Sequence, residues 1–470
     1  MSPSPSTAPS SLPLPPSVGL PVVGAIPFLF RNHLARAIAA REKYGDIYDL
    51  KIGTMSCIAL NHPRHAQHLL RDNAQAYGKG GPMWDFVREF VGNGLPTSEG
   101  EFWRRQRRML QPQFIKERVN GLAGLIVDAI DETLEVWHQA AASGEPFKVS
   151  EAIARTTMNV IVKAMFGADI SSEEAKIVND ELHYAFGFQA AKMLSGALPS
   201  WVPIPGSRRF DRAIGVIDGI VYRLIERRRS RGSEGAGGDY IGLMLAAVDD
   251  ETGARMTNEQ LRDEAIAIFI AGYETTSTFL SFACGELAKN PQVAQALYAE
   301  CDTVLGQATP TVAHLQRMPQ LYMTIHEVLR LYPSAYWLPR TSEEEDVIDG
   351  FRIPKGTLVV LMTYVLHRHP EFWPEPERFD PWRFTPERSA GRHPLAWIPF
   401  GTGQRQCIGK DFALLEAQLI LCRLLSSFEF ELSPHHEIQA ELAATLRPRN
   451  GMWLQVSKRT PAKSRMSAMG

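Results

Sequence analysis

The sequence predicts a mainly helical protein with a minor β part, an α+β fold. Apolar residues recur at helical spacing through the middle of the chain, and short strand-like runs occur only near its two ends. Of the 470 residues, 44% are hydrophobic and 22% are charged, as in an ordinary globular protein. A chain of this length can bury a large core, and its composition excludes a mostly disordered, collagen-like or coiled-coil protein.

Charge and cysteine usage exclude several classes of function. The chain has 50 Lys plus Arg and 52 Asp plus Glu, a net charge of −2, which argues against a nucleic-acid-binding protein. Its five cysteines are scattered and none forms a C-x-x-C pair, so a disulfide framework or a closed zinc site is not expected. Glycine-rich phosphate-binding motifs are absent, which removes most support for phosphoryl transfer or a Rossmann dinucleotide site.

The first segment predicts a disordered arm over residues 1–17, because it is rich in proline and serine. Eight prolines fall in the first thirty residues, and they interrupt the apolar stretch 12–30. Proline breaks helices, and a spanning helix needs about 20 continuous apolar residues. No Lys or Arg precedes this stretch, as a signal peptide would require. We therefore expect a soluble, cytoplasmic protein with no transmembrane anchor.

The remaining elements follow from local patterns. Two apolar runs around Gly53-Thr54-Met55 predict a β-hairpin over 45–61. Helical spacing predicts helices over 101–111, 119–142, 150–166, 209–230, 256–290, 313–332 and 408–427. Residues 230–238 predict a flexible loop, residues 346–353 and 357–361 two strands separated by Pro354-Lys355-Gly356, and residues 370–406 an irregular segment. Residues 458–470 predict a basic, flexible tail.

The most informative residue is Cys407, which lies in a glycine-rich loop directly before the last predicted helix. Backbone N–H groups and a helix N-terminus stabilise a thiolate over a thiol. Glycines such as Gly401 and Gly409 let the backbone approach a flat ligand, and Phe400 is placed to cover the sulfur. No histidine lies nearby, so a metal ligand is favoured over a nucleophile, while a buried free cysteine is the alternative.

The run from Phe400 to Gly409 has the pattern F-x-x-G-x-R-x-C-x-G. It resembles the haem-binding loop of the cytochromes P450, and four further motifs make the chain similar to this family over about residues 18–457. The resemblance implies haem b with Cys407 as the axial iron ligand. It also implies that Phe400, Gly401, Arg405 and Gly409 line the cofactor.

The pair Glu327 and Arg330 shares one helix face, because the two residues are three positions apart. Alone, such a pair is most often a solvated surface pair. In the resemblance it joins an arginine of a later P-E-R-F segment, here Arg378 of Pro376-Glu377-Arg378-Phe379. The three residues are thereby expected to form a buried structural network that holds the cysteine loop.

Trp103 and Arg107 are one turn apart in a predicted helix. In isolation they fit a basic amphipathic helix. The resemblance implies that they grip a haem propionate, since arginine suits carboxylates. Arg340, ten residues after Arg330, matches a second propionate arginine by position alone.

The stretch Ala271-Gly272-Tyr273-Glu274-Thr275-Thr276 places an acid and hydroxyls inside a long apolar helix. Buried polar groups need a reason, and a satisfied polar kink is the plain alternative. It resembles the family's oxygen-binding signature, which implies that Ala271 and Gly272 border the cofactor where the helix kinks. Thr275 and Glu274 are then the catalytic residues that deliver protons to dioxygen.

The resemblance implies a haem-thiolate monooxygenase that hydroxylates or epoxidises an apolar lipid, terpenoid or polyketide-type compound of secondary metabolism with O2. Ordinary core packing is the alternative for each residue of the expected substrate pocket. That pocket comprises Met83, Trp84, Phe86, Val87 and Phe90 in a loop, Ile266, Phe269 and Ile270 in the long helix, Ala335, Tyr336, Trp337 and Leu338, and Met452 at the far side. Residues 186–205 are expected to form a mobile entrance.

No flavin or iron–sulfur motif is fused to the chain. Electrons from NAD(P)H are therefore expected to arrive through a separate ferredoxin or flavodoxin with its reductase. Such donors are acidic, so Arg104, Arg105, Arg108, Arg405 and Lys410 are candidates for a basic docking face. We expect a monomer with a single haem domain over residues 18–457.

Three alternatives remain open at this point. The same fold serves peroxide-using peroxygenases and redox-neutral isomerases, which usually lack the acid–threonine pair. A non-catalytic haem- or ligand-binding protein is the third.

Overall fold

The computed structural model describes residues 11–18, 33–51, 56–167, 171–194, 205–231 and 239–460. Contacts divide the chain into two compact units, and both are built from several separate stretches. The first unit contains Met1–Trp84, Leu329–Arg378 and Pro386–Cys407; the second contains Asp85–Val328, Phe379–Thr385 and Ile408–Gly470. The predicted α+β class, dominated by helices, is confirmed. A single domain over 18–457 stays a prediction.

A six-stranded sheet forms the framework of the first unit, in the order β1-β2-β3-β9-β6-β4. The strands are β1 (Ser17–Val18), β2 (Ile47–Leu50), β3 (Cys57–Leu60), β4 (Tyr77–Gly78), β6 (Leu338–Ser342) and β9 (Leu358–Leu361). The hairpin β2–β3 is antiparallel, with Ile47 opposite Leu60, which confirms the predicted hairpin. The apolar runs of β3 and β9 pair in parallel and are buried, so they form the core of this unit.

Residues 11–18 are ordered, which corrects the disordered arm predicted for 1–17 over residues 11–17; residues 1–10 lie outside the described part. Ser17 pairs with Asp49 in parallel register. The carbonyl groups of Pro16 and Pro13 accept hydrogen bonds from the N–H groups of Asp49 and Arg352, both at 2.9 Å. Proline lacks an N–H but keeps its carbonyl, so a proline-rich segment can still pair along a sheet edge.

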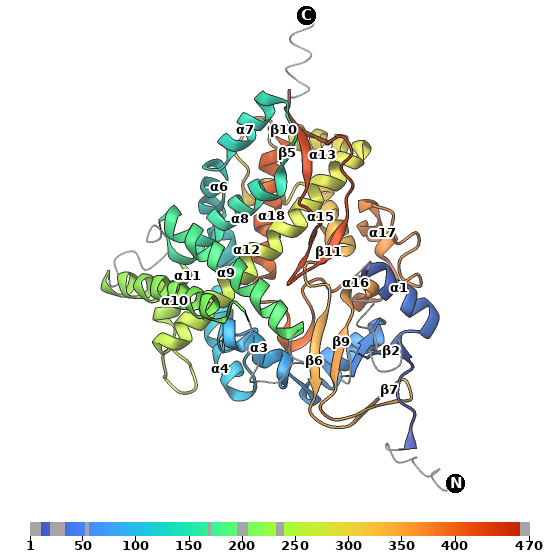
Figure 1. Ribbon diagram of the computed structural model, residues 1–470. Helices are drawn as coiled ribbons and strands as arrows, with labels where there is room; N and C mark the ends of the chain where they lie inside the picture. The colour runs from blue at the N-terminus through green and yellow to red at the C-terminus, as the bar shows by residue number, and fades with distance from the viewer. Residues whose placement is uncertain are drawn as a thin grey trace, which may run out of the picture. The chain divides into compact units, whose positions relative to one another are not determined.

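The predicted strand over 346–353 is instead a small hairpin of β7 (Asp346–Ile348) and β8 (Phe351–Ile353). Asp349 and Gly350 have positive φ values of 51° and 80°, which makes a two-residue turn. The first unit also contains α1 (His33–Tyr44), α2 (Pro63–Gln67), η3 (His68–Asp72), η4 (Ala74–Ala76), α16 (Thr363–Leu366), α17 (Pro386–Ser389), η8 (Pro394–Ala396) and η9 (Gly403–Arg405). Figure 1 shows α1 and α16 close to one another beside the strands of the sheet.

The second unit is mainly helical. Its helices include α4 (Gly100–Leu110), η5 (Gln111–Gln113), α5 (Lys116–Gly121), α6 (Ala123–Asp131), α7 (Leu134–Ser143), α8 (Val149–Phe166), α9 (Ser172–Leu194), α10 (Ser207–Ser230), α11 (Tyr240–Ala246), α12 (Asn258–Lys289), α13 (Pro291–Val304), α14 (Val312–Leu315), η7 (Pro381–Phe384) and α18 (Lys410–Leu425). α3 (Pro82–Val91) and α15 (Pro319–Leu331) each contribute residues to both units. Figure 1 shows α12 running among the other helices of this unit, with α8 and α18 beside it.

Helix α12 begins at a capping box. The Thr257 hydroxyl accepts a hydrogen bond from the Gln260 N–H, and the Gln260 side chain accepts one from the Thr257 N–H. Along the helix, α8 packs so closely that a Cβ added at Gly272 would lie 2.6 Å from Ile161 Cδ1. A glycine at this position therefore permits the contact between the two helices.

Two predicted helices are interrupted. The segment 119–142 contains parts of α5, α6 and α7, and the segment 313–332 is divided into α14 and α15. Pro319 starts α15, since proline fits the first helical turn and cannot continue a preceding helix. The helices α1, α3, α9 and α13 are additional to those predicted. Residues 186–194 of the predicted entrance belong to α9; residues 195–204, and residues 232–238 of the predicted loop, lie outside the described residues.

A three-stranded sheet closes the second unit, in the order β10-β13-β5. Its strands are β10 (Phe428–Leu432), β13 (Trp453–Lys458) and β5 (Phe147–Lys148), and a separate hairpin pairs β11 (Ala440–Leu442) with β12 (Leu446–Pro448). Of the tail predicted to be flexible over 458–470, the described residues 458–460 are held through Arg459, which is 7% exposed and donates to the Tyr298 carbonyl and to Asp302. Residues 461–470 lie outside the described part.

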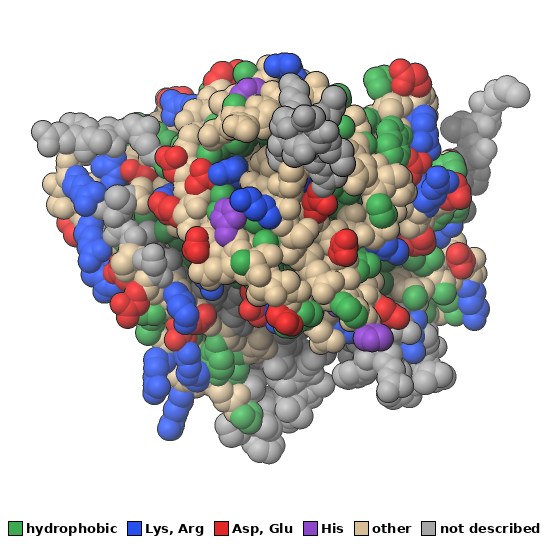
Figure 2. All heavy atoms as spheres, turned by 90° about the horizontal axis from the view of Figure 1, so that it is seen from above, with side chains coloured by type: hydrophobic (Ala, Val, Ile, Leu, Met, Phe, Trp, Pro, Cys, Tyr) green, Lys and Arg blue, Asp and Glu red, His purple; other side chains and the backbone are tan. Residues whose placement is uncertain are grey.

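Among the described residues, α12 is long and apolar enough to cross a membrane by length and composition alone. However, 67% of its most apolar stretch is buried inside the protein, as expected for a core helix. Figure 2 shows acidic and basic side chains interspersed over most of the face seen from above.

Candidate active site

The loop that carries Cys407 is held by its own backbone. The Cys407 N–H donates to the Phe400 carbonyl at 2.9 Å, and the Gln406 N–H donates to the Gly403 carbonyl at 3.1 Å. Cys407 is exposed, whereas the other four cysteines are buried. The loop therefore presents one accessible thiol, the donor that the sequence singled out.

This loop lies directly on η3 of the same unit. Gly403 has φ +72°, and a Cβ at this position would lie 2.1 Å from the Leu70 carbonyl oxygen. Arg71 Nε also donates to Thr402 Oγ1 at 2.9 Å. Only glycine permits this approach of two backbones, so Gly403 fixes where the cysteine loop begins.

Arg330 supports the irregular segment that precedes the loop. It is fully buried, and its guanidinium donates to the carbonyls of His367, Pro376 and Arg378 at 3.0, 2.7 and 3.2 Å. The same group lies 5.1 Å from the centre of the Trp373 ring. Arg330 thus links its own helix to the segment from His367 to Arg378 and is not a surface charge.

Glu327 makes a buried ion pair in the second unit, and its arginine partner corrects the prediction. Arg383 Nε and the Asp380 N–H each donate to Glu327 Oε1 at 3.0 Å. The side chain of Arg378 is instead 64% exposed and pairs with Glu375. Arg378 and Arg383 each lie two residues after a proline and directly before a phenylalanine, so the sequence pattern does not distinguish them. Only their burial in the fold shows which one pairs with Glu327.

The predicted propionate-binding residues occupy different units. Trp103 is buried on α4 and Arg107, one turn later, is half-buried. Arg340 lies in β6, half-buried, with one guanidinium nitrogen donating to the Pro339 carbonyl at 2.7 Å. Arg108, expected in a docking face, is bound to Asp249 and Glu251 within the second unit.

The stretch 271–276 remains helical within α12. Thr275 Oγ1 donates to the Ala271 carbonyl at 2.5 Å, so its hydroxyl is directed along its own helix. Ala271 is exposed although most residues of α12 are buried. The Glu274 carboxylate accepts a hydrogen bond from Thr445 Oγ1 at 2.9 Å.

Two residues expected to line the substrate pocket lie on the opposite face of α12. Ile266 and Phe269 pack with α8, α9 and α10 around a small apolar gap and are each 3% exposed. At 100° per residue they point away from Ala271 and Thr275. Ile270 is partly exposed. The predictions for Ile266 and Phe269 are therefore wrong, because an apolar residue in a buried helix most often faces core.

Met452 is also wrongly assigned to that pocket. It is fully buried, and a Cβ added at Gly285 would lie 2.6 Å from its sulfur. Gly285 is 15 residues beyond Ile270, or roughly 22 Å along the helix. Met452 is therefore a core residue at the far end of α12.

The other expected pocket residues lie in two places. Met83, Phe86 and Val87 are partly exposed on α3, which is a helix and not the predicted loop, because apolar residues recur there at positions 83, 87 and 91 after Pro82. Trp84 is buried beneath Lys79, and the side chain of Phe90 lies outside the described part. After α15, Ala335 and Leu338 are half-buried, and Tyr336 and Trp337 stack with ring centres 5.7 Å apart.

Two acidic residues of α12 that the sequence reading missed hold the segment between α3 and α4. Asp263 accepts from the Asn93 N–H at 2.7 Å, and Glu264 accepts from the Leu95 N–H at 3.1 Å. Burial raises the pKa of the Glu264 carboxyl to about 8, against the opposing effect of the Leu95 N–H. The sequence does show two consecutive acids, Asp263 and Glu264, directly before an apolar run, and this pattern could have indicated their role.

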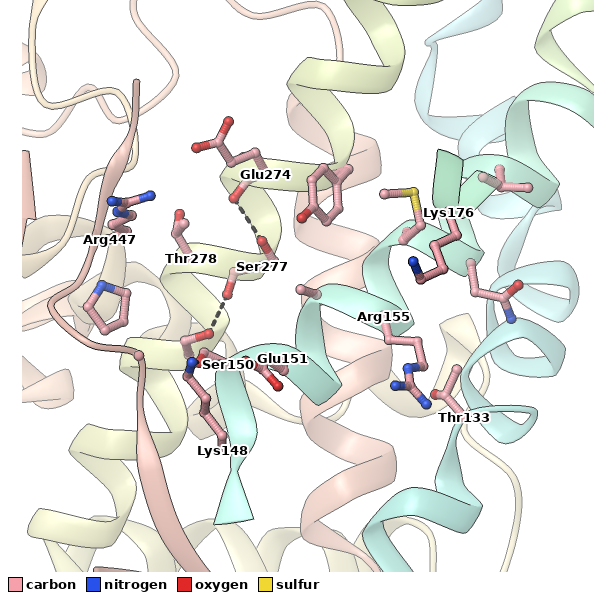
Figure 3. Close-up of a pocket in the computed structure, with 18 of the residues that line it drawn as sticks. Thr133, Lys148, Ser150, Glu151, Arg155, Lys176, Glu274, Ser277, Thr278 and Arg447 are labelled. Atoms are coloured by element: carbon pink, nitrogen blue, oxygen red, sulfur yellow. Dashed lines mark hydrogen bonds and ion pairs between the residues drawn. The ribbon is translucent and has the colours of Figure 1, made fainter. Parts of the chain in front are cut away.

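A polar cavity of about 1290 Å³ lies along the second half of α12. Figure 3 shows Glu274, Ser277 and Thr278 on α12, together with Lys148, Arg155 and Arg447 from other elements. Several hydroxyls on the helix donate to its own carbonyls, including Ser277 to Glu274 and Ser281 to Ser277. This cavity was not predicted, since its lining comes from distant parts of the chain.

The donor set fits a haem with a thiolate ligand. The Cys407 thiol is accessible, and the space where a Cβ at Gly409 would lie is open, as the approach of a flat macrocycle to this loop requires. Fold and site together define a haem-thiolate oxygenase.

The family model for cytochrome P450 matches residues 13–455, and the chain belongs to this family. It is 32% identical to cyclooctatin synthase of Streptomyces melanosporofaciens over 423 residues, which cover 90% of each chain. It is 31% identical to cyclooctat-9-en-7-ol 5-monooxygenase of the same organism, over 91% of this chain and 90% of that one. The crystal structure of the cytochrome P450DA heme domain matches with a TM-score of 0.86 and 29% identity, over 96% and 98% of the two chains. The protein is thus a cytochrome P450 monooxygenase, and the family implies haem b, O2 and electrons from NAD(P)H through partners.

Proposed function

We propose that this monooxygenase inserts one oxygen atom from O2 into an apolar terpenoid. The combination of the accessible Cys407 thiol with the Glu274–Thr275 pair carries the proposal, because isomerases and peroxygenases have no need of proton delivery to O2. Support for the substrate class comes from the relative named for cyclooctat-9-en-7-ol, at 31% identity over 91% of this chain.

Cys407 would bind the haem iron as a thiolate, and the bound haem supplies the redox chemistry of oxygen insertion. Phe400, Gly401, Arg405 and Gly409 would border the haem from the loop, and Ala271 from α12. The glycine at 272 would keep α12 seated on α8, as its contact with Ile161 requires. Trp103, Arg107 and Arg340 would bind the propionates, for which arginine supplies charge-assisted hydrogen bonds.

Protons would reach the oxygen through Thr275 and Glu274. The Thr275 hydroxyl gives its hydrogen bond to the Ala271 carbonyl, and it can exchange this acceptor for a reacting oxygen. Glu274 would resupply the proton, since a carboxyl group at a polar cavity exchanges readily with solvent. Several of the expected pocket residues remain candidates for excluding water around the substrate: Met83, Trp84, Phe86, Val87, Phe90, Ile270, Ala335, Tyr336, Trp337 and Leu338.

Electrons would come from a ferredoxin or flavodoxin with its reductase. Arg105 and Lys410 remain candidates for the docking face, and for Arg405 this role is the alternative to its place at the haem. Arg104 pairs with Glu101, and Arg108 with two acids. We further propose that the protein is a cytoplasmic monomer. A peroxide-driven reaction is the second candidate, because it would use the same cysteine loop without redox partners.

The test compares turnover of cyclooctat-9-en-7-ol under two electron supplies: a surrogate ferredoxin with reductase and NADH, and hydrogen peroxide alone. We expect oxygenated product with the first supply and a loss of about 100-fold in Thr275→Ala. Ser277→Ala is the matched control, because its hydroxyl donates to the Glu274 carbonyl on the same helix. Product from peroxide alone, with Thr275→Ala unimpaired, would assign the second candidate. Binding of a substrate should also shift the haem absorption spectrum. If neither this compound nor other apolar terpenoids give a spectral shift or a product, the proposed substrate class is wrong.

A further inference from the structure

The hairpin of β11 and β12 borders the polar cavity beside α12. Glu441, Arg447 and Pro448 of this hairpin line the cavity with Glu274 and Ser277 of α12, and α8 contributes further residues. The hairpin is fixed by the antiparallel pairing of Leu442 with Leu446, and the Ala443 N–H donates to the Thr445 carbonyl at 3.0 Å. Thr445 therefore occupies a defined place at the turn.

Thr445 is the side-chain partner of the Glu274 carboxylate among the described residues. Its Oγ1 donates to Glu274 Oε1 at 2.9 Å, and Thr445 is 8% exposed. The contact joins residues 171 positions apart in the chain. A buried hydroxyl that donates to a carboxylate makes a charge-assisted hydrogen bond, which fixes the direction of both groups.

Four of the five basic residues that line the cavity pair with acids other than Glu274, and among the described residues no ion pair joins the fifth, Arg155, to Glu274. Arg447 pairs with Glu441 at 2.8 Å and Lys148 pairs with Glu151 at 2.8 Å. Lys163 pairs with Glu132, and Lys176 with Asp180. The orientation of Glu274 is thus set by a neutral hydroxyl rather than by a cation. A hydrogen bond from a neutral hydroxyl opposes the protonation of a carboxylate less strongly than a tight ion pair does.

We propose that Thr445 is a positioning residue that holds the Glu274 carboxylate at the border of this cavity, where it is reprotonated after each proton it delivers. The inference builds on the proposed role of Glu274 as a proton donor. In each cycle the Glu274 O–H bond breaks as its proton moves toward Thr275, and solvent in the cavity returns one proton to the carboxylate. No electron is transferred in this step.

The test uses the haem-loaded enzyme with Thr445→Val, which keeps the side-chain shape and removes the hydroxyl, and Thr445→Ser, which restores it. Thr303→Val is the matched control, because Thr303 is exposed on α13 and its hydroxyl bonds only its own helix. Ferredoxin-driven O2 consumption is measured in H2O and in D2O, which needs no identified substrate. Crystal structures of the variants report the position of the Glu274 carboxylate independently of activity.

We expect Thr445→Val to slow O2 consumption by about tenfold and to increase the solvent isotope effect. This loss of rate is smaller than the ~100-fold loss expected when a proton donor is removed outright. Its crystal structure should show the Glu274 carboxylate turned away from the hairpin. Thr445→Ser should restore the rate, the isotope effect and the carboxylate position, and Thr303→Val should match the wild type. Should Thr445→Val not accumulate as holoenzyme, Thr445→Ala provides the same comparison.

Each result decides between the two proposals. If Glu274→Gln leaves O2 consumption and its isotope effect unchanged, the proton-donor role itself fails. If Glu274→Gln is slow but Thr445→Val keeps the wild-type rate and carboxylate position, the inference about Thr445 is wrong. Equal losses in Thr445→Val and Thr445→Ser, or in Thr303→Val, would likewise overturn it, because the hydroxyl would not be the cause.

Discussion

Glu327 and Arg383 are both buried, and each satisfies the charge of the other in the second unit. Glu327 also accepts from the Asp380 N–H, so the carboxylate holds the backbone as well as the arginine. Removal of one partner would strongly destabilise the fold, because the other charge would stay buried with neither water nor an opposite charge to stabilise it. The position of a charge in the fold therefore decides its role, and its sequence motif does not.

The first prediction separates Arg383 from Arg378. Arg383→Gln should lower the free energy of unfolding by about 3–5 kcal/mol, since Glu327 would be left buried without its cation. Arg378→Gln should change it by less than about 1 kcal/mol, because that side chain is 64% exposed. Urea unfolding followed by circular dichroism measures both. A larger effect in Arg378→Gln than in Arg383→Gln would reinstate Arg378 as the network residue.

Glu264 gives a prediction for pH dependence. Burial raises its pKa in the folded protein from 4.5 to about 8, so the folded state keeps a proton that the unfolded state releases. Its contribution to stability is full below about pH 4.5 and is lost as the pH rises toward 8. Each pH unit in this window lowers the free energy of unfolding by about 1.4 kcal/mol relative to a side chain that does not titrate.

Glu264→Gln is the matched variant, because glutamine keeps the shape and an acceptor for the Leu95 N–H. The difference in unfolding free energy between wild type and Glu264→Gln should move in favour of the variant between about pH 5 and pH 8, and then become constant. Urea unfolding at several pH values measures this difference. A difference that does not depend on pH would show that Glu264 has an ordinary pKa.

The cysteine loop and η3 form one supporting element of the first unit. Gly403 lies against the Leu70 carbonyl, and Thr402 accepts from Arg71 in the same contact. Both interactions hold the loop against η3, and neither involves the residues that follow Cys407. The loop thus depends on a stretch more than 300 residues earlier in the chain, which no local pattern reveals.

Substitution of Gly403 tests this support. Gly403→Ala should destabilise the protein by about 1–3 kcal/mol through overpacking against backbone and lower the haem retained per chain. Gly391→Ala is the control, because Gly391 has φ +77° but open space around its Cα, so it reports the strain of positive φ alone. Thermal melts and haem absorbance per protein measure both effects. Equal losses in the two variants would mean that the contact with Leu70 contributes nothing.

At the scale of the whole molecule, two units share the chain in alternating segments. The predicted helices over 101–111, 150–166, 209–230, 256–290 and 408–427 are found within a few residues, because their apolar periodicity is long and regular. Some of the missed elements are short: α3 has ten residues, and β1 has only two, Ser17 and Val18, directly after a proline-rich segment. The ends of the chain could not be judged from composition, since order at Pro16 and Arg459 comes from distant partners.

Spacing within one element was enough to single out candidate site residues, as at Cys407 and at Glu274 with Thr275, and their roles stay predictions. It was not predictable where distant segments meet. The choice between Arg378 and Arg383, the core positions of Ile266, Phe269 and Met452, and the bond from Thr445 to Glu274 all depend on tertiary contacts. The 100° spacing of residues along the predicted helix already places Ile266 and Phe269 on the face opposite Ala271, so the sequence itself could have corrected these two predictions.

Cys407 as the axial haem ligand is the central claim, and a spectrum of the reduced protein with carbon monoxide tests it most directly. The wild type should show the red-shifted Soret band of a thiolate ligand, and Cys407→Ala and Cys407→His should lose it. Cys301→Ala, at a buried cysteine of α13, should keep the band. A Cys407 variant that retains the band would contradict the account.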